Sequence, residues 1–287
     1  MKEFALYTGC TTPVRLPSYE ASVKAVLSRL GITLVDMSDA NCCGAQYIES
    51  VSHKAFVAMS ARILALAEKM GLDLLTVCGA CSGSIKTVKH ELDHDKKLRD
   101  EINALLAEEG LTYTGKYEVK HLLQVFAEDI GYEAIREAIV RPYKGVRLSA
   151  HYGCHVTRPE EIVQVDDAEN PTIIDKIIEI AGGTAVDYVG KTRCCGGPML
   201  GVDPILASRI GRDKIENIRA ENVQGIVTVC EFCNLQLTQV QFGDEVEGLD
   251  KIPVITLPQF LGPALGIDFD SLGISMNRIS PQPVLQG

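Results

Sequence analysis

The ten cysteines of this chain fall into two sets of five that follow the same order along the sequence. Each set has a lone cysteine, an adjacent Cys-Cys pair and a C-x-x-C motif, and 34 residues (44–77 and 196–229) separate the pair from the motif in both sets. Hydrophobic packing gives thiols no reason to recur at a fixed spacing, whereas metal ligation does. The first set is Cys10, Cys42, Cys43, Cys78 and Cys81, and the second set is Cys154, Cys194, Cys195, Cys230 and Cys233.

The spacing of these cysteines suits thiolate ligation of iron. In a C-x-x-C motif the second cysteine folds back beside the first, so that both sulfurs face one ion. Adjacent cysteines on an extended segment point to opposite sides of the chain, and a Cys-Cys pair therefore fits two metals of one cluster better than one tetrahedral ion. A cubane four-iron cluster needs four thiolates, and each set offers five. The count indicates either an unusual cluster or one spare cysteine in each set.

Disulfides, zinc and inert core thiols each account for the cysteine pattern less well than iron does. Structural disulfides need an oxidising compartment, and the opening MKEFALYTGC has none of the features of a secretory signal peptide. Zinc sites often use two C-x-x-C motifs, but residues 82–229 separate the two motifs here and zinc would leave the Cys-Cys pairs without a role. Ten inert buried thiols with a repeated spacing would be a coincidence.

Strands and helices are expected to alternate in the same order in both halves of the chain, followed in each half by the same strand-and-helix unit (119–131 and 254–266). Alternation of this kind predicts an α/β fold with two pseudo-symmetric halves and mostly parallel sheets. The proline and glycine between Arg141 and Gly145 place the boundary there, giving domains 1–144 and 145–287. The ranges expected are 4–7, 19–30, 34–37, 54–70, 74–77 and 82–92 in the first half, and 146–150, 172–181, 185–189, 204–220, 226–229 and 234–241 in the second.

This order places a cysteine at the carboxyl end of four strands, at positions 10, 78, 154 and 230. Sites in open parallel sheets form beyond the carboxyl ends of the strands, so the two sets should converge there. The second cysteine of each C-x-x-C motif is expected to begin a helix, whose N-terminus favours thiolates and an anionic cluster. The glycines that would bring backbone N–H groups to the sulfurs are Gly44, Gly79, Gly153, Gly196 and Gly197.

The composition suits a globular cytoplasmic protein of two average domains, since the chain has 287 residues. A net charge of -10 and a pI of about 5.1 disfavour nucleic acid as a partner. No apolar run approaches the ~20 residues that span a membrane, and no G-x-G-x-x-G follows a predicted strand, so we expect neither nicotinamide nor flavin on this chain. The polar tail after Arg278 should be loosely held or lie on a partner.

The complete cysteine pattern resembles the duplicated cysteine-rich CCG domain, in which a glycine follows each pair, as Gly44 and Gly196 do here. Over nearly its whole length the chain resembles the B subunit of heterodisulfide reductase, including the segment 151–155 (HYGCH). The resemblance implies two noncubane [4Fe-4S] clusters, with each half carrying one five-cysteine CCG motif whose cysteines are the metal and cofactor ligands. It also implies that a disulfide is cleaved between the clusters.

The activity implied by this resemblance is that of an oxidoreductase of methanogenesis, which reduces the coenzyme M–coenzyme B disulfide to two thiols. The implied partners are a C-type subunit that carries cubane [4Fe-4S] clusters and delivers electrons, and an A-type subunit that holds flavin. His155, directly after Cys154, is a weak candidate for a proton donor, because the unperturbed pKa of histidine lies near neutrality. Lys191 and Arg193, before Cys194, are candidates to bind an anionic substrate group.

Two further functions stay open. The chain could be a B-like subunit that acts on another disulfide or persulfide, or an electron-transfer subunit of a lactate-, succinate- or glycerol-3-phosphate-type oxidoreductase. Around the cysteines it departs from the methanogen pattern, notably at Gln46, Met199 and Glu231, and at Asn234 where histidine is expected. These positions should line the cavity between the clusters, so they bear on the identity of the disulfide.

Overall fold

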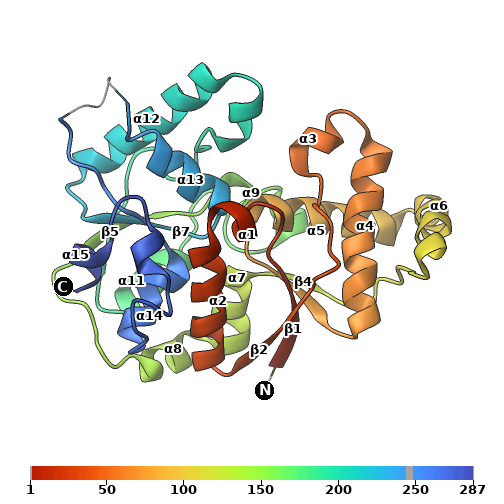
Figure 1. Cartoon of the computed structure of the whole chain (residues 1–287), viewed down its shortest axis with the longest axis horizontal. Coiled ribbons are helices and arrows are strands. Elements are labelled where there is room, and N and C mark those ends of the chain that lie inside the picture. Colours follow the sequence, from red (N-terminus) through yellow and green to blue (C-terminus); the bar gives the residue numbers. More distant parts are fainter. Residues whose placement is uncertain (1, 244–247, 287) are drawn as a thin grey trace.

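Two four-stranded parallel sheets, one in each half of the chain, are the frame of the molecule (Figure 1). The computed structural model describes residues 2–243 and 248–286, apart from the side chain of Gln46. The strand order is β2-β1-β3-β4 in the first sheet and β6-β5-β7-β8 in the second, so the two sheets have the same topology. The strands are β1 (Lys2–Tyr7), β2 (Ile32–Asp36), β3 (Asp73–Thr76), β4 (Val119–His121), β5 (Arg147–His151), β6 (Thr184–Ala185), β7 (Gly225–Thr228) and β8 (Val254–Thr256).

Helices follow the strands in each half, as the alternating pattern predicts. The first half contains α1 (Thr12–Arg15), α2 (Pro17–Arg29), α3 (Ala45–Glu49), α4 (His53–Met70), α5 (Gly79–His94), α6 (Lys96–Leu106), η1 (Ala107–Glu109), α7 (Leu122–Gln124), the π-helical η2 (Val125–Ile130) and α8 (Tyr132–Ala138). The second half contains α9 (Cys154–Thr157), α10 (Glu160–Val163), α11 (Ile173–Ile180), η3 (Gly197–Gly201), α12 (Pro204–Ala220), α13 (Glu231–Gln239), α14 (Leu257–Ala264), η5 (Ile274–Met276) and α15 (Gln282–Leu285).

The unit that closes each half repeats in its capping as well as in its order. β4 leads into α7 and β8 leads into α14, and each helix begins with a capping box. In this arrangement the cap side chain accepts from a backbone N–H while a glutamine reaches back to the cap N–H. The caps are His121 with Gln124 and Thr256 with Gln259. The predicted fold class, two pseudo-symmetric α/β halves with parallel sheets, is therefore confirmed.

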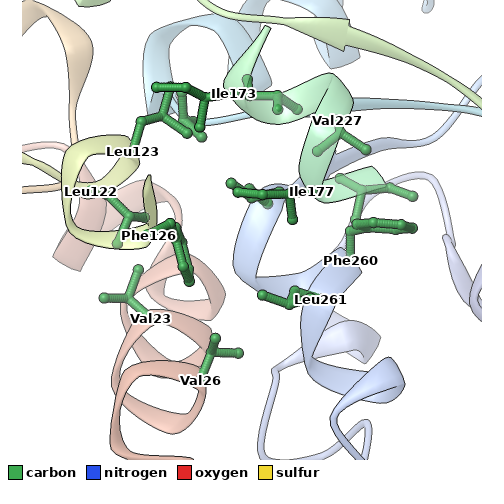
Figure 2. Close-up of a cluster of buried hydrophobic side chains, with 14 of the residues drawn as sticks. Val23, Val26, Leu122, Leu123, Phe126, Ile173, Ile177, Val227, Phe260 and Leu261 are labelled. Atoms are coloured by element: carbon green, nitrogen blue, oxygen red, sulfur yellow. The ribbon is translucent and has the colours of Figure 1, made fainter. Parts of the chain in front are cut away.

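The two halves share their hydrophobic interior, because each of the two core clusters contains residues from both halves. In Figure 2, Val23 and Val26 of α2 face the region of Ile177 of α11 and Leu261 of α14. Figure 1 shows α2 at the centre of the molecule, with α14 beside it. The aromatic rings of Tyr143 and Phe260 stack at a centroid distance of 4.8 Å where the chain crosses between halves.

Three local predictions were wrong. The helices after the C-x-x-C motifs begin directly after the first cysteine, not at the second, because Cys78 and Cys230 are extended cap residues. The strand expected at 185–189 is only the two residues of β6, since the chain turns away after pairing with β5. The tail after Arg278 is packed rather than loose, because Val284 and Leu285 of α15 are buried in the shared core.

Within the described ranges, none of the helices is long and apolar enough to cross a membrane.

Candidate metal centre

The carboxyl ends of four central strands bring the cysteine motifs to the contact between the two halves. Cys78 and Cys230 follow β3 and β7 and cap the N-termini of α5 and α13. Cys10 lies in the turn after β1, and Cys154 begins α9 after β5. Parallel strands end at one edge of their sheet, and the two edges face each other, so both five-cysteine sets converge on one region.

The ten thiols form one continuous row that has the same order from either end. The lone cysteine of each set contacts the first member of the Cys-Cys pair, and the second member contacts the second cysteine of the C-x-x-C motif. In the first half both of these Sγ–Sγ distances are 3.4 Å, and the second half repeats both contacts. The first cysteines of the two C-x-x-C motifs meet in the middle. The row is Cys10, Cys42, Cys43, Cys81, Cys78, Cys230, Cys233, Cys195, Cys194 and Cys154.

Backbone N–H groups point at the sulfurs from the glycines that follow the Cys-Cys pairs. The N–H of Gly44 donates to Cys42 Sγ at 3.4 Å and the N–H of Gly196 donates to Cys194 Sγ at 3.3 Å. Both glycines have left-handed backbones, with φ of +86° and +87°, which other residues adopt only at a cost. The Gly197 N–H donates to Cys195 Sγ at 3.4 Å. These donors would stabilise thiolates or cluster sulfurs, as expected from the sequence.

The donor set fits thiolate-bound metal clusters. None of the ten cysteines forms a disulfide, and six of them are buried. Contacts with neighbouring thiols and burial raise the pKa values of seven of the cysteines. Such contacts lower the pKa values of the other three, to about 2 for Cys194 and below the ordinary value for Cys81 and Cys230. Lowered pKa values keep these groups as thiolates, the form that binds metal. Five converging sulfurs in each half therefore satisfy the requirements of one cluster in each half.

A single tyrosine joins the two C-x-x-C motifs, and the cysteine spacing gave no sign of it. The hydroxyl of Tyr19 lies 2.8 Å from the carbonyl oxygen of Val77 and 3.1 Å from that of Val229. These two residues directly precede Cys78 and Cys230, so one hydroxyl hydrogen is shared between equivalent points of the two halves. Tyr19 is completely buried in α2. An aromatic residue at helical spacing is an ordinary core residue in sequence, and only the tertiary structure reveals the bridging role.

The surroundings of the two cysteine sets differ in charge. Beside the second set, the amine of Lys214 is buried and donates to the Gly190 carbonyl at 2.6 Å, above the ring of Tyr188. Burial lowers the pKa of Lys214 to about 8. His151 ends β5 with its Nδ1 3.1 Å from the Tyr188 hydroxyl, and burial lowers its pKa to about 3. In the first half Tyr7 ends β1 at the equivalent position, so each set has its own polar neighbours.

Beside the first set lies an acidic group that belongs to the second half. Glu231 is the first residue of α13, and its side chain is buried with 1% of its surface exposed. One carboxylate oxygen and the sulfurs of Cys78 and Cys81 all lie within 4.8 Å of one another. Burial, with a smaller contribution from the charge of Cys230, raises the pKa of Glu231 to about 8. Glu231 therefore lies between the two C-x-x-C motifs, but it does not line the small cavity between the halves, contrary to the expectation from the sequence.

A small cavity of about 20 Å³ lies between the halves and is lined almost entirely by apolar atoms. Its walls include Gly79 and Ala80 from the first C-x-x-C motif and Pro198 and Phe232 from the second half. The volume is close to the space of one water molecule.

Met199, half-buried in η3, and Asn234, whose side chain donates to the Val254 carbonyl at 3.0 Å, do not line this cavity, contrary to expectation. The side chain of Gln46 lies outside the described part of the chain.

Three further residues singled out in the sequence have different surroundings. His155 lines the cavity, with its Nδ1 3.3 Å from the sulfur of Cys154. Lys191 is half-buried and paired with Asp175 at 2.9 Å and with Asp187 at 3.6 Å. Its charge is therefore already compensated, whereas the side chain of Arg193 is exposed.

Comparison with known proteins agrees with this geometry. The cysteine-rich domain family CCG matches residues 4–86 and 148–238, which include all ten cysteines. The B subunit of the ferredoxin/F(420)H(2)-dependent CoB-CoM heterodisulfide reductase of Methanosarcina acetivorans is 34% identical over 284 residues, covering 97% of this chain and 94% of that protein. The 8-methylmenaquinol:fumarate reductase membrane anchor subunit of Wolinella succinogenes is 32% identical over 280 residues, covering 97% of both chains.

A solved structure shows the same fold. A hypothetical protein from Helicobacter pylori has a TM-score of 0.76 to this chain at 17% sequence identity. The similarity covers 96% of this chain and 51% of that one, so this chain spans about half of the solved protein.

Two α/β halves, each with a parallel sheet, and thiols that converge between them define a metal-binding protein of the duplicated cysteine-rich class. This chain belongs to the CCG cysteine-rich domain family, of which it contains two copies, and it is similar over 97% of its length to heterodisulfide reductase B subunits.

Proposed function

We propose that this chain is the catalytic iron–sulfur subunit of a heterodisulfide reductase, which cleaves the coenzyme M–coenzyme B disulfide reductively to two thiols. The observation that carries the proposal is the row of ten thiols, which offers five sulfur donors on each side of the contact between Cys78 and Cys230. Each five-cysteine set would hold one noncubane [4Fe-4S] cluster. The similarity to the Methanosarcina protein over nearly the whole chain supports the choice of substrate.

The reaction adds two electrons and two protons to the disulfide, so that R–S–S–R′ becomes R–SH and R′–SH. When bound, the clusters would supply iron sites for the two sulfurs and the electrons, one at a time. The apolar walls at Ala80, Pro198 and Phe232 would exclude water from the region between the halves. His155 reaches this region beside Cys154 and would deliver one of the two protons from its ring nitrogen.

The proposed assembly is a cytoplasmic complex with two partners. A C-type subunit with cubane [4Fe-4S] clusters would deliver electrons to this chain, and a flavin-binding A-type subunit would supply electrons to the C-type subunit. Separate subunits are proposed because this sequence contains neither the ferredoxin cysteine run nor a dinucleotide fingerprint. We also propose the domain boundary at 144/145, two residues before β5 begins. This boundary separates the two five-cysteine sets.

A second candidate is a subunit that transfers electrons without cleaving a disulfide. One observation favours it, namely that the Wolinella protein, 32% identical over 97% of this chain, is named as a subunit of a fumarate reductase. A third candidate acts on a different disulfide or persulfide. The buried Glu231 between the motifs, where the methanogen pattern differs, favours this possibility.

The experiment that tests these functions is an anaerobic assay with reduced benzyl viologen as the electron donor. Iron-loaded protein is offered the coenzyme M–coenzyme B heterodisulfide, and in parallel cystine and glutathione disulfide. Rapid oxidation of the dye with the heterodisulfide alone is the expected result. Turnover of another disulfide instead would contradict the proposed substrate. Full iron content without turnover of any disulfide would contradict reductase activity and favour electron transfer.

A further inference from the structure

Glu231 is a buried polar side chain to which the five-cysteine pattern gives no role. It follows Cys230 of the second set, yet its carboxylate lies against the sulfurs of the first set. Gly9, in the turn before Cys10, leaves room for this approach. A Cβ at that glycine would lie 3.2 Å from the sulfur of Cys81 and 3.8 Å from Oε1 of Glu231.

One oxygen of this carboxylate lacks a partner. Oε2 of Glu231 is buried and has no hydrogen-bond partner among the described residues. Burying a carboxyl oxygen without a partner is unfavourable, so buried carboxyl groups are normally hydrogen-bonded, paired with a cation or bound to metal. One oxygen of this carboxyl group lies within 4.8 Å of the sulfurs of Cys78 and Cys81, and Cys78 is within hydrogen-bonding reach of the group. Both sulfurs are metal ligands by type. Two thiol sulfurs and one carboxylate oxygen within this distance could bind a single metal ion.

The equivalent position in the other half cannot supply a carboxylate. Gly79 follows Cys78 as Glu231 follows Cys230, and a Cβ at Gly79 would lie 2.5 Å from Cγ2 of Val156. The second set therefore receives no carboxylate from Gly79, the residue that corresponds to Glu231. Whatever Glu231 does at the first set is not repeated by symmetry at the second.

We propose that the carboxylate of Glu231 is an additional ligand of the first cluster, bound to the iron that Cys78 and Cys81 hold. This inference rests on the proposed cluster at the first set. The first cluster would then be bound by both halves of the chain, with five sulfur ligands from the first half and one oxygen ligand from the second. At the second set, the corresponding non-sulfur group among the described residues is the imidazole of His151, which lies within 4.8 Å of the sulfurs of Cys195 and Cys233.

The test is Mössbauer spectroscopy of the full chain loaded with 57Fe, comparing wild type with Glu231→Gln and Glu231→Asp. Oxygen ligation makes an iron site harder and more ionic than thiolate ligation, so wild type should show one iron subsite with a raised isomer shift. Glu231→Gln should lose this subsite while the other signals persist. Iron release to a chelator should become about tenfold faster in this variant, the scale seen when groups that support a metal site are removed.

Matched variants separate ligation from a structural effect. Glu216→Gln removes an exposed carboxylate from α12 of the same half and should leave spectrum and release rate unchanged. Glu231→Asp keeps the charge on a shorter side chain and should restore part of the subsite. Circular dichroism and thermal unfolding confirm that each variant is folded before the spectra are compared.

The outcomes distinguish this inference from the function on which it rests. Wild-type protein that cleaves a disulfide, with spectra identical to those of Glu231→Gln, would overturn the ligation and leave the reductase proposal standing. Wild-type protein that assembles no iron–sulfur cluster would overturn both.

Discussion

At the residue scale, the two adjacent cysteines of each set contact different neighbours. Cys42 contacts Cys10 whereas Cys43 contacts Cys81, both at 3.4 Å. The sulfurs of Cys42 and Cys43 also contact each other. The second half repeats these contacts. One Cys-Cys pair thereby links the lone cysteine of its set to the C-x-x-C motif. The expectation that the two adjacent side chains point to opposite sides is therefore wrong, because neither Cys-Cys pair lies on an extended strand.

Replacing Cys81 or Cys233 with alanine should each remove one cluster. Each residue contacts both its motif partner and the Cys-Cys pair, so its loss interrupts the row at a buried point. We expect iron content to fall by about half, because five sulfurs on the unaltered side remain, and turnover to be lost. Colorimetric iron analysis and the viologen assay on anaerobically purified protein measure both effects.

The control for these variants is Ser82→Ala. The Ser82 hydroxyl is buried beside Cys81 without a hydrogen-bond partner in the described part of the chain, so its removal should leave the iron content unchanged. Full iron content and activity in Cys81→Ala or Cys233→Ala would show that the residue is not a ligand.

His121 should make the protein sensitive to acid. Burial lowers its pKa to about 3, while the unfolded chain has the ordinary value near 6.5. The unfolded state therefore binds an extra proton between these values, and the stability that neutral His121 contributes, present above pH 6.5, is lost as pH falls toward 3. In His121→Asn, the slope of unfolding free energy against pH below 6 should decrease by about 1.4 kcal/mol per pH unit.

Chemical denaturation of the full chain at pH values from 4.5 to 7.5 measures that slope. His90→Asn changes an exposed histidine and should keep the slope of wild type. An unchanged slope in His121→Asn would mean that the histidine becomes charged within the folded protein.

At the scale of elements, α2 determines how the two C-x-x-C motifs face each other. Its Tyr19 hydroxyl is shared between the carbonyl oxygens that precede Cys78 and Cys230. Hydrophobic spacing predicts the helix within two residues at its N-terminus, because apolar residues recur at helical intervals. The hydrogen bonds join segments 58 and 210 residues away from Tyr19, and no local pattern in the sequence encodes them.

Tyr19→Phe should destabilise the protein by about 1–3 kcal/mol, because two buried carbonyl groups lose their shared donor without a change in packing. Urea denaturation measures the loss. Tyr47→Phe is a suitable comparison, since the Tyr47 hydroxyl also joins the halves, donating to the Pro198 carbonyl at 2.9 Å, but from an exposed position. A change within about 0.5 kcal/mol is expected for that variant, and an equally small change in Tyr19→Phe would refute the bridging role.

The order of strands and helices could be predicted because it depends on local sequence signals. The residues at which they begin and end also depend on tertiary contacts. Apolar runs and cap residues located α4 and α12, and α12 begins at Pro204 as predicted. The starts of α5 and α13 were predicted too late, because a cysteine is not a typical cap residue. The ligand candidates followed from cysteine spacing, whereas Tyr19 and Lys214 matter through neighbours that only the folded chain supplies.

At the scale of the whole molecule, the halves are repeats in sequence but not independent units in space. Both hydrophobic clusters draw on both halves, and α2 of the first half packs against α14 of the second. The repeat predicts where along the sequence one half ends and the other begins. It does not show how much surface the two halves share in the folded protein. This sharing is what brings the two cysteine sets into contact.

Separate expression of residues 1–144 and 145–287 should give two fragments that do not fold alone. Each would expose the apolar residues that it contributes to the shared clusters, among them Tyr19 and Val23 in the first fragment and Ile177 and Phe260 in the second. Mixing the fragments should restore cooperative unfolding and native circular dichroism. A cooperative thermal transition in either isolated fragment would contradict the shared core.

The palindromic order of the thiols also bears on ancestry. A single gene for one half would have made a twofold homodimer, with its C-x-x-C motifs meeting on the axis as Cys78 and Cys230 do now. In such a dimer two copies of Tyr19 would have competed for the one place on the axis, and a glutamate after one motif would have required a glutamate after the other. Joining the copies in one chain removed that constraint. Within one chain, one half can therefore carry the bridging Tyr19 and the other the buried Glu231, which exact twofold symmetry would forbid.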